Sequence, residues 1–185
     1  MTLEIDNQNP KKLIDLARKG DSEAFQALYN QFAVPLFRYI FFRVARKEDA
    51  EDILQQVFLK AYRSLGNFKD TGNEPLAYFY TIARTTVIDH QRKKRDSLID
   101  HMAEFAQTVP DQAIHVADLI SARSDIAVVK KALQELSEDQ QEVLTLKYIN
   151  DLDTSEIAHI LNKTEMAVRQ LQSRGIKALK QKLNP

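Results

Sequence analysis

Residues 153–177 read DTSEIAHILNKTEMAVRQLQSRGIK, and this stretch decides the predicted fold. Asp153 and Glu156 have the spacing of a capping box, which predicts that a helix begins directly after Asp153. Asn162 follows that helix at a position that favours the left-handed conformation, which asparagine tolerates. A basic amphipathic helix comes next. A capped helix, a short turn and a basic helix predict a helix-turn-helix, whose second helix enters the major groove of DNA.

The predicted second helix, residues 165–183, has one apolar and one polar face. Its apolar stripe begins at Val168 and Leu171 and continues through Gly175, where a close helix approach is expected. We expect arginines near the N-terminal end of the helix to contact guanine, and Ser173 and Lys177 to hold phosphate. An ordinary solvated helix is the alternative, but the capped helix and turn before it favour DNA binding. The candidate DNA-contacting residues are Thr164, Glu165, Arg169, Gln170, Ser173, Arg174 and Lys177.

Helical periodicity extends outward from this motif over most of the chain. Ser137 and Gln140 have the spacing of a second capping box, and residues 66–75 are rich in turn formers. Residues 96–127 mix acids, a proline and short apolar clusters, which is typical of a linker. The sequence predicts an all-α protein with two small helical domains, 1–95 and 128–185, joined by a flexible linker at 96–127. Helices are predicted at about 11–19, 21–41, 48–65, 76–92, 126–135, 138–149, 154–161 and 165–183.

Charge is segregated along the chain although the formal net charge is zero. Residues 84–95 carry a net +4 and residues 163–183 a net +5, whereas residues 96–127 carry −5 and residues 128–162 carry −4. Such segregation indicates surface patches with different partners. Solvated helix faces are an equally good explanation for either basic run taken alone.

The composition argues against several classes of protein. The chain has no cysteine, which excludes disulfides and thiolate metal sites and fits a reducing cytoplasm. No apolar run approaches the roughly 20 residues that span a bilayer, and residues 1–6 lack the features of a signal peptide. The four histidines are scattered, and no phosphate-binding glycine loop is present. We therefore expect a cytoplasmic protein that needs no metal or cofactor, does not insert into membranes and is not an enzyme.

Two further stretches have features that suit binding. Tyr78-Phe79-Tyr80 lies between the 66–75 loop and basic residues, and such aromatics can stack on unpaired bases. The three rings cannot all face a core, although each ring singly is more simply explained as core. The helix at 48–65 combines acid, amide and apolar groups on one face, which suits contact with another protein, with a solvated face as the simpler alternative.

The order of these motifs resembles an extracytoplasmic-function sigma factor of bacterial RNA polymerase, in the sigma-70 superfamily. The resemblance rests on Gly20-Asp21-x-x-Ala24-Phe25, on Asp49 to Phe58, on Ile82-Ala-Arg84 with Asp89 and Arg92, and on the C-terminal helix-turn-helix. It implies that residues 1–95 are sigma region 2 and residues 128–185 are sigma region 4. It also implies binding to the clamp and flap of core RNA polymerase, recognition of the −10 and −35 promoter elements, and DNA melting.

The resemblance assigns roles to residues by position. The −35 reader is the helix with the seven polar residues named above, and the acidic linker threads towards the active-site channel. The expected polymerase-binding residues are Asp52, Gln55, Gln56 and Leu59. The expected −10 contacts are Asn67, Phe68, Lys69, Asn73, Tyr78, Arg84, Thr85 and Arg92.

Alternatives remain open at the level of sequence. A stand-alone helix-turn-helix regulator is the second hypothesis, and it predicts a dimer on a two-fold operator. The resemblance also allows an anti-sigma protein as a further partner. The relative arrangement of the two domains is not determined, and a compact closed state is expected to hide both DNA-binding helices.

Overall fold

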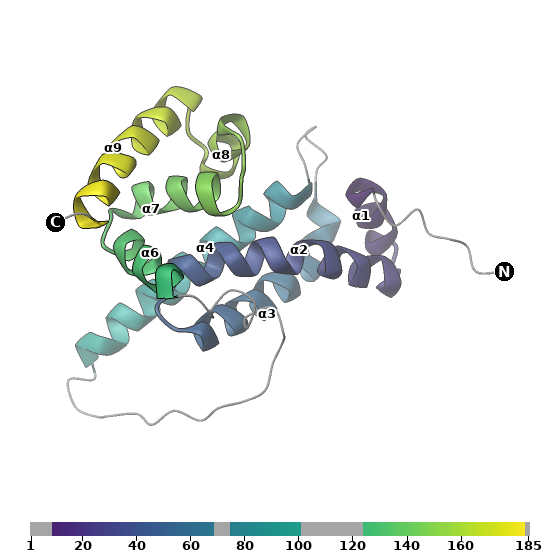
Figure 1. Cartoon of the computed structure of the whole chain (residues 1–185). Helices are drawn as coiled ribbons and strands as arrows, with labels where there is room; N and C mark the ends of the chain where they lie inside the picture. The colour runs from purple at the N-terminus through teal and green to yellow at the C-terminus, as the bar shows by residue number, and fades with distance from the viewer. Residues whose placement is uncertain (1–8, 69–74, 101–123, 184–185) are drawn as a thin grey trace.

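The computed structural model describes residues 9–68, 75–100 and 124–183, and every regular element in these ranges is helical (Figure 1). This confirms the predicted all-α class. The elements are α1 (Pro10–Arg18), α2 (Ser22–Arg43), α3 (Lys47–Ser64), the 3-10 turn η1 (Leu65–Asn67), α4 (Pro75–Asp100), α6 (Ser124–Gln134), α7 (Glu138–Leu144), the π-helical turn η2 (Thr145–Ile149), α8 (Thr154–Leu161) and α9 (Glu165–Leu183).

The N-terminal half, residues 9–100, is built on α2, α3 and α4. Gly20 ends α1 with a φ of 93°, and the carboxylate of Asp21 caps α2 by accepting hydrogen bonds from the backbone N–H groups of Glu23 and Ala24. In the core, the ring of Phe79 lies 5.0 Å from that of Phe32 and 5.6 Å from that of Phe58. These aromatic contacts join the three helices into one core.

The C-terminal half, residues 124–183, contains the predicted helix-turn-helix in α8 and α9. Asp153 and Glu156 form the expected capping box, and Asn162 has the left-handed φ of 51°. Gly175 of α9 lies so close to α7 that a Cβ atom there would be 3.1 Å from Cδ1 of Leu144. The local signals of the motif are therefore confirmed.

Three local predictions differ from the structure. Ser137 precedes α7, but its side chain makes no capping hydrogen bond, so the predicted capping box there is wrong. The predicted helix at 138–149 changes from α to π geometry at Thr145. The helix predicted to end near Arg92 continues to Asp100, because residues 93–100 contain no glycine or proline to stop it. Residues 96–100 and 124–127 of the predicted linker belong to α4 and α6, and residues 101–123 lie outside the described residues.

The two halves pack against each other, which answers the question that the sequence left open. Helices α6, α7 and α8, with the turn η2, lie along α2 and α4 (Figure 1). In the same view α9 lies on the side of the C-terminal half away from α3. The expectation that a closed state hides both DNA-binding helices is wrong for α9, because its polar face stays exposed.

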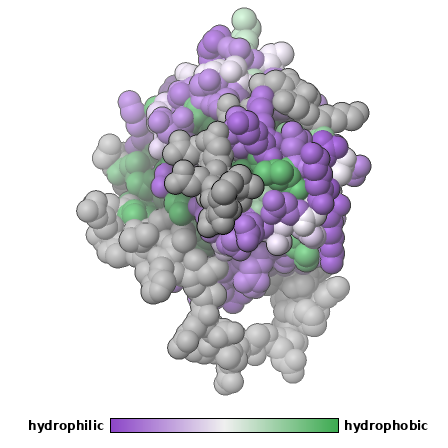
Figure 2. Space-filling view, turned by 90° about the vertical axis from the view of Figure 1, so that its right-hand side faces the viewer, coloured by the Kyte–Doolittle hydropathy of each residue, from purple (hydrophilic) through white to green (hydrophobic). Residues whose placement is uncertain are grey.

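Seen from the α1 end, the surface is mostly hydrophilic with small separate hydrophobic patches (Figure 2). Single exposed apolar residues are ordinary on a protein surface, so these patches do not indicate a binding site for a partner.

A cluster around Asp49 ties the first turn of α3 to α4. Asp49 is buried, and its carboxylate lies 2.7 Å from Nη2 of Arg46, 3.3 Å from Nζ of Lys94 and 3.6 Å from Nε2 of His90. Burial alone raises the pKa of Asp49, but the hydrogen bonds and charges of Arg46 and Lys94 outweigh burial and lower it. The cluster therefore stabilises the fold only while Asp49 is ionised.

We predict that Phe79→Ala lowers the free energy of unfolding by about 3–5 kcal/mol, because it leaves a cavity among three packed helices. Urea unfolding followed by circular dichroism measures the change. Leu59→Ala, at a side chain that is 49% exposed, is the control and costs less than about 1 kcal/mol. Equal losses in the two variants would contradict the assigned core.

We also predict that Asp49→Asn makes stability less dependent on pH in acid. The lowered pKa means that the contribution of Asp49 is complete above its unfolded value of about 3.9 and is lost as the pH falls through the folded value. The stability difference between wild type and Asp49→Asn should shrink as the pH drops below about 4. Parallel pH profiles of the two proteins would contradict this account.

Candidate functional site

The polar face of α9 is the candidate DNA-reading surface. All seven residues predicted for it, from Thr164 to Lys177, are exposed, whereas Val168 and Gly175 on the opposite side are buried. The backbone N–H of Ala167 donates a 3.2 Å hydrogen bond to the hydroxyl of Thr164, which fixes the start of the helix. The structure thus brings the predicted residues onto one accessible surface.

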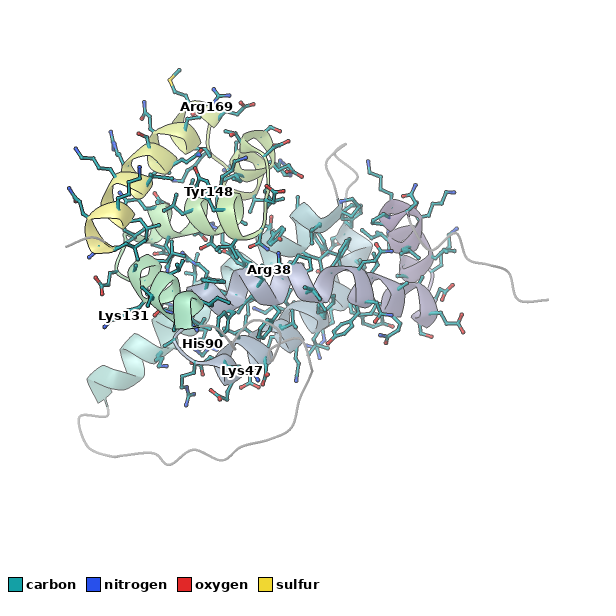
Figure 3. The ribbon with its side chains drawn as sticks, in the orientation of Figure 1. Arg38, Lys47, His90, Lys131, Tyr148 and Arg169 are labelled. Atoms are coloured by element: carbon teal, nitrogen blue, oxygen red, sulfur yellow. The ribbon has the colours of Figure 1, made fainter. Side chains whose placement is uncertain are left out.

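Arg169 is held in place on this face. Its Nη2 lies 2.7 Å from the carboxylate of Glu165, one turn earlier (Figure 3). Arg174 and Lys177 form no ion pair with another described residue, so their charges are available to an anionic ligand. An exposed pair adds little stability, and its effect here is to limit the directions in which the Arg169 guanidinium points.

Sequence reasoning missed Met166, whose side chain is 67% exposed between Glu165 and Arg169. It lies off the apolar stripe of α9, and that offset was the signal that could have identified it. Met166 is therefore an exposed apolar side chain on the same face of α9 as Glu165 and Arg169, and side chains of this kind can contact thymine methyl groups when a helix lies in the major groove.

A second candidate surface lies where η1 meets the start of α4. Phe68 and Tyr78 are half-buried, and their rings pack edge to face with centroids 5.2 Å apart. The hydroxyl of Tyr78 is hydrogen-bonded to that of Ser64, and Asn67 is exposed beside this aromatic pair. Lys69 and Asn73, predicted for the same surface, lie outside the described residues.

The three remaining predicted −10 residues lie further along α4 and do not form one cluster. Thr85 is exposed, and its hydroxyl donates to backbone carbonyls of its own helix. Arg92 is exposed and lies 3.3 Å from Asp89. Arg84 is only 28% exposed, and its Nε donates to both carboxylate oxygens of Glu142, at 3.1 and 2.9 Å. Arg84 therefore faces the C-terminal half in this structure.

The environment of Arg84 shifts the pKa of its guanidinium. Burial alone lowers the pKa of the guanidinium, but the hydrogen bond and negative charge of Glu142 outweigh burial and raise it. Sequence reasoning missed Glu142, because an acid in a helix rich in acids looks like an ordinary solvated residue. Glu142 differs from the other acids of this helix in its contact with Arg84, which is distant in sequence.

The outward face of α3 is the third candidate surface. Asp52, Gln55 and Gln56 are exposed, and Leu59 and Tyr62 beside them are 49% and 51% exposed. The other side of α3 is buried against α2 and α4. An exposed face with amides, one acid and two large apolar groups suits a protein partner.

Other kinds of site are not seen in the ranges that the structure describes. No three His, Asp or Glu side chains in these ranges come together as metal ligands. Among the described helices, none has the length and apolar character that a bilayer-spanning segment requires.

Comparison with known proteins gives two family matches on the same chain. Residues 28–97 match Sigma-70 region 2, and residues 132–181 match Sigma-70 region 4. Together the two matches include all of α3 and α8 and most of α4 and α9.

Characterised relatives agree with these matches. The chain is 32% identical over 174 residues to the ECF RNA polymerase sigma factor BldN of Streptomyces coelicolor, covering 94% of this chain and 66% of that relative. It is 29% identical to the ECF RNA polymerase sigma factor SigW of Bacillus subtilis, covering 94% of this chain and 96% of SigW.

Solved structures share the fold. CnrH, in complex with the cytosolic domain of CnrY, superposes with a TM-score of 0.73 at 21% identity, covering 95% of this chain and 97% of that chain. The sigma factor RpoE of Bartonella quintana, in complex with the anti-sigma factor NepR, gives 0.69 at 23% identity, with 86% and 96% covered. From the two sigma-70 regions, the relatives and the shared fold, we conclude that this chain belongs to the sigma-70 family of RNA polymerase sigma factors, in its extracytoplasmic-function group.

Proposed function

We propose that this chain directs promoter-specific initiation of transcription by binding core RNA polymerase, reading the −10 and −35 promoter elements and promoting DNA melting. The observation that carries the proposal is the polar, accessible face of α9 on a capped helix-turn-helix, in a chain that also matches region 2. A stand-alone regulator needs the helix-turn-helix but leaves the exposed face of α3 without a role.

Each surface has a proposed part in this function. Thr164 to Lys177 of α9 read the −35 element, with Arg169 contacting a base and Ser173 and Lys177 holding phosphate. Phe68 and Tyr78, with the neighbouring loop and α4, bind the −10 element by stacking on an unpaired base. Asp52, Gln55, Gln56 and Leu59 of α3 contact the polymerase clamp, and the C-terminal half contacts the flap.

We further propose that residues 1–95 act as region 2, residues 96–127 as an acidic linker and residues 128–185 as region 4. Sigma factors are initiation factors and catalyse no reaction of their own. Because the proposed partner is core RNA polymerase, we propose that the protein acts in the cytoplasm. An anti-sigma protein is a further proposed partner, supported by the complex of the similar RpoE with NepR.

We predict that the triple change of Asp52, Gln55 and Gln56 to alanine weakens binding to bacterial core RNA polymerase about tenfold or more, because interface side chains near a contact centre carry most of the affinity. Co-purification and titration with labelled core polymerase measure it. The matched control replaces Glu23, Gln26 and Asn30, an acid and two amides exposed on α2, and should bind as wild type does.

Loss of binding in both triple variants would contradict the assignment of this interface to α3. A folded wild-type chain that binds no core polymerase would falsify the proposed function and favour the stand-alone regulator.

We predict that Arg169→Ala reduces discrimination between −35 sequences by about 1–3 kcal/mol, because it removes a potential bidentate contact with guanine. The measurement is holoenzyme binding to a promoter fragment selected from a random library by the wild type, and to single-base variants of it. Lys180→Ala, also on α9 and exposed, is the control and should leave base preference unchanged. If Arg169→Ala weakens all fragments equally, Arg169 holds phosphate and reads no base.

A further inference from the structure

The interface between residues 9–100 and residues 124–183, called the seam below, centres on one buried carboxylate. Glu142 of α7 is fully buried, and its Oε1 accepts a 3.1 Å hydrogen bond from the hydroxyl of Tyr39. It also accepts the two bonds from Arg84 and lies 3.6 Å from Nη2 of Arg43. Tyr39 and Arg43 belong to α2 and Arg84 to α4. A single side chain of the C-terminal half thus joins three side chains of the N-terminal half.

The C-terminal half also caps the end of α2. The last carbonyl groups of a helix lack partners within the helix and need donors from elsewhere. Gln134 donates to the carbonyl of Val44 at 2.8 Å, and Lys130 donates to that of Ala45 at 3.1 Å. The Lys130 ammonium also lies 3.7 Å from the centroid of the Phe41 ring. These contacts hold α6 against the end of α2.

A third set of contacts lies at the other end of the seam. The side-chain amide of Asn150 donates to the carbonyl of Pro35 and to the hydroxyl of Tyr80, both at 2.7 Å. Arg38 donates to the carbonyl of Ile149 at 3.3 Å, and its position between the two halves is visible in Figure 3. The halves are therefore joined along the length of α2.

The seam combines apolar residues of both halves with buried charged groups that are incompletely satisfied. Nε and Nη2 of Arg43 are buried without a hydrogen-bond partner among the described residues. A cavity of about 500 Å³ lies beside Arg43 and is lined in part by Asp49, His90 and Lys94. Because burying charges costs much of what their attraction returns, a seam of this kind separates more easily than an apolar one.

The closed arrangement affects the candidate surfaces unequally. It engages Arg84 and brings α8 against α4, the helix proposed to bind the −10 element. It leaves Asp52, Gln55 and Gln56 exposed on α3, and Arg169 exposed on α9. One DNA surface is thereby occupied while the polymerase surface stays free.

We propose that Glu142 is an internal latch that holds the free chain closed by binding Arg84 and Arg43. Breaking a buried ion pair by neutralising one partner is strongly unfavourable for the contact that buries it. Glu142→Gln keeps the shape of the side chain and removes its charge, and therefore favours the open state.

The chain offers a direct test because it has no cysteine. Lys93→Cys on α4 and Lys131→Cys on α6, both at exposed positions, carry nitroxide labels on the two sides of the seam. Double electron–electron resonance then gives the distribution of distances between the halves. The labelled wild type should show one narrow distance, and Glu142→Gln should raise the ratio of open to closed chains about tenfold or more.

Glu135→Gln is the matched control. Glu135 pairs with Lys182 at 2.8 Å within the C-terminal half, so its loss should leave the distance distribution unchanged. Tyr39→Phe removes only a hydroxyl donor to Glu142 and should shift the distribution in the same direction by a smaller amount. If circular dichroism shows that Glu142→Gln is unfolded, the distance distribution of Tyr39→Phe tests the latch in its place. A wild type as broadly distributed as Glu142→Gln, or a Glu142→Gln distribution identical to that of Glu135→Gln, overturns the latch.

Discussion

The structure depends on the packing of α7 on two sides. Residues 141–146, at the junction of α7 and η2, are all buried, although a lone helix in a small domain usually buries one face only. Leu144 meets Gly175 of α9, and Glu142 meets α2 and α4. The same short segment therefore forms the core of the helix-turn-helix half and fixes that half against the other. A helix buried on both sides is usually apolar throughout, and here Gln141 and Glu142 have partners in the other half.

The local parts of the fold could be predicted from the sequence because their causes are local. Gly20, Asp21, the capping box at Asp153 and the left-handed Asn162 each act within a few residues, and each is found as predicted. The helix ends predicted least well are those without a strong stop signal, as at Arg92. The exposed faces of α3 and α9 follow from helical periodicity, since the apolar stripes determine which side faces outward.

The parts that could not be predicted depend on residues distant in sequence. Glu142 and Arg84 are 58 positions apart, and neither has an unusual neighbour that reveals the pairing. Tyr62 fits an apolar stripe by spacing, yet it lies at the edge of α3 where the core ends. Charge counting indicated the basic and acidic stretches but not which of them meet. The assignment of surfaces to promoter elements came from family resemblance. The geometry adds that Arg84 of α4 is covered by the C-terminal half, whereas the polar face of α9 is exposed.

The contact of Gly175 with Leu144 has a geometric consequence for the way α9 is presented. It is a fulcrum, because Gly175 has no side chain and the backbone of α9 therefore rests directly on the Leu144 side chain. Glu165 lies ten residues nearer the N-terminus, a lever arm of about 15 Å at the helical rise of about 1.5 Å per residue. A tilt of about 4° at the fulcrum displaces that end of α9 by about 1 Å, a large fraction of a hydrogen-bond length. Gly175, the smallest residue in α9, thus determines where the N-terminal end of this helix points.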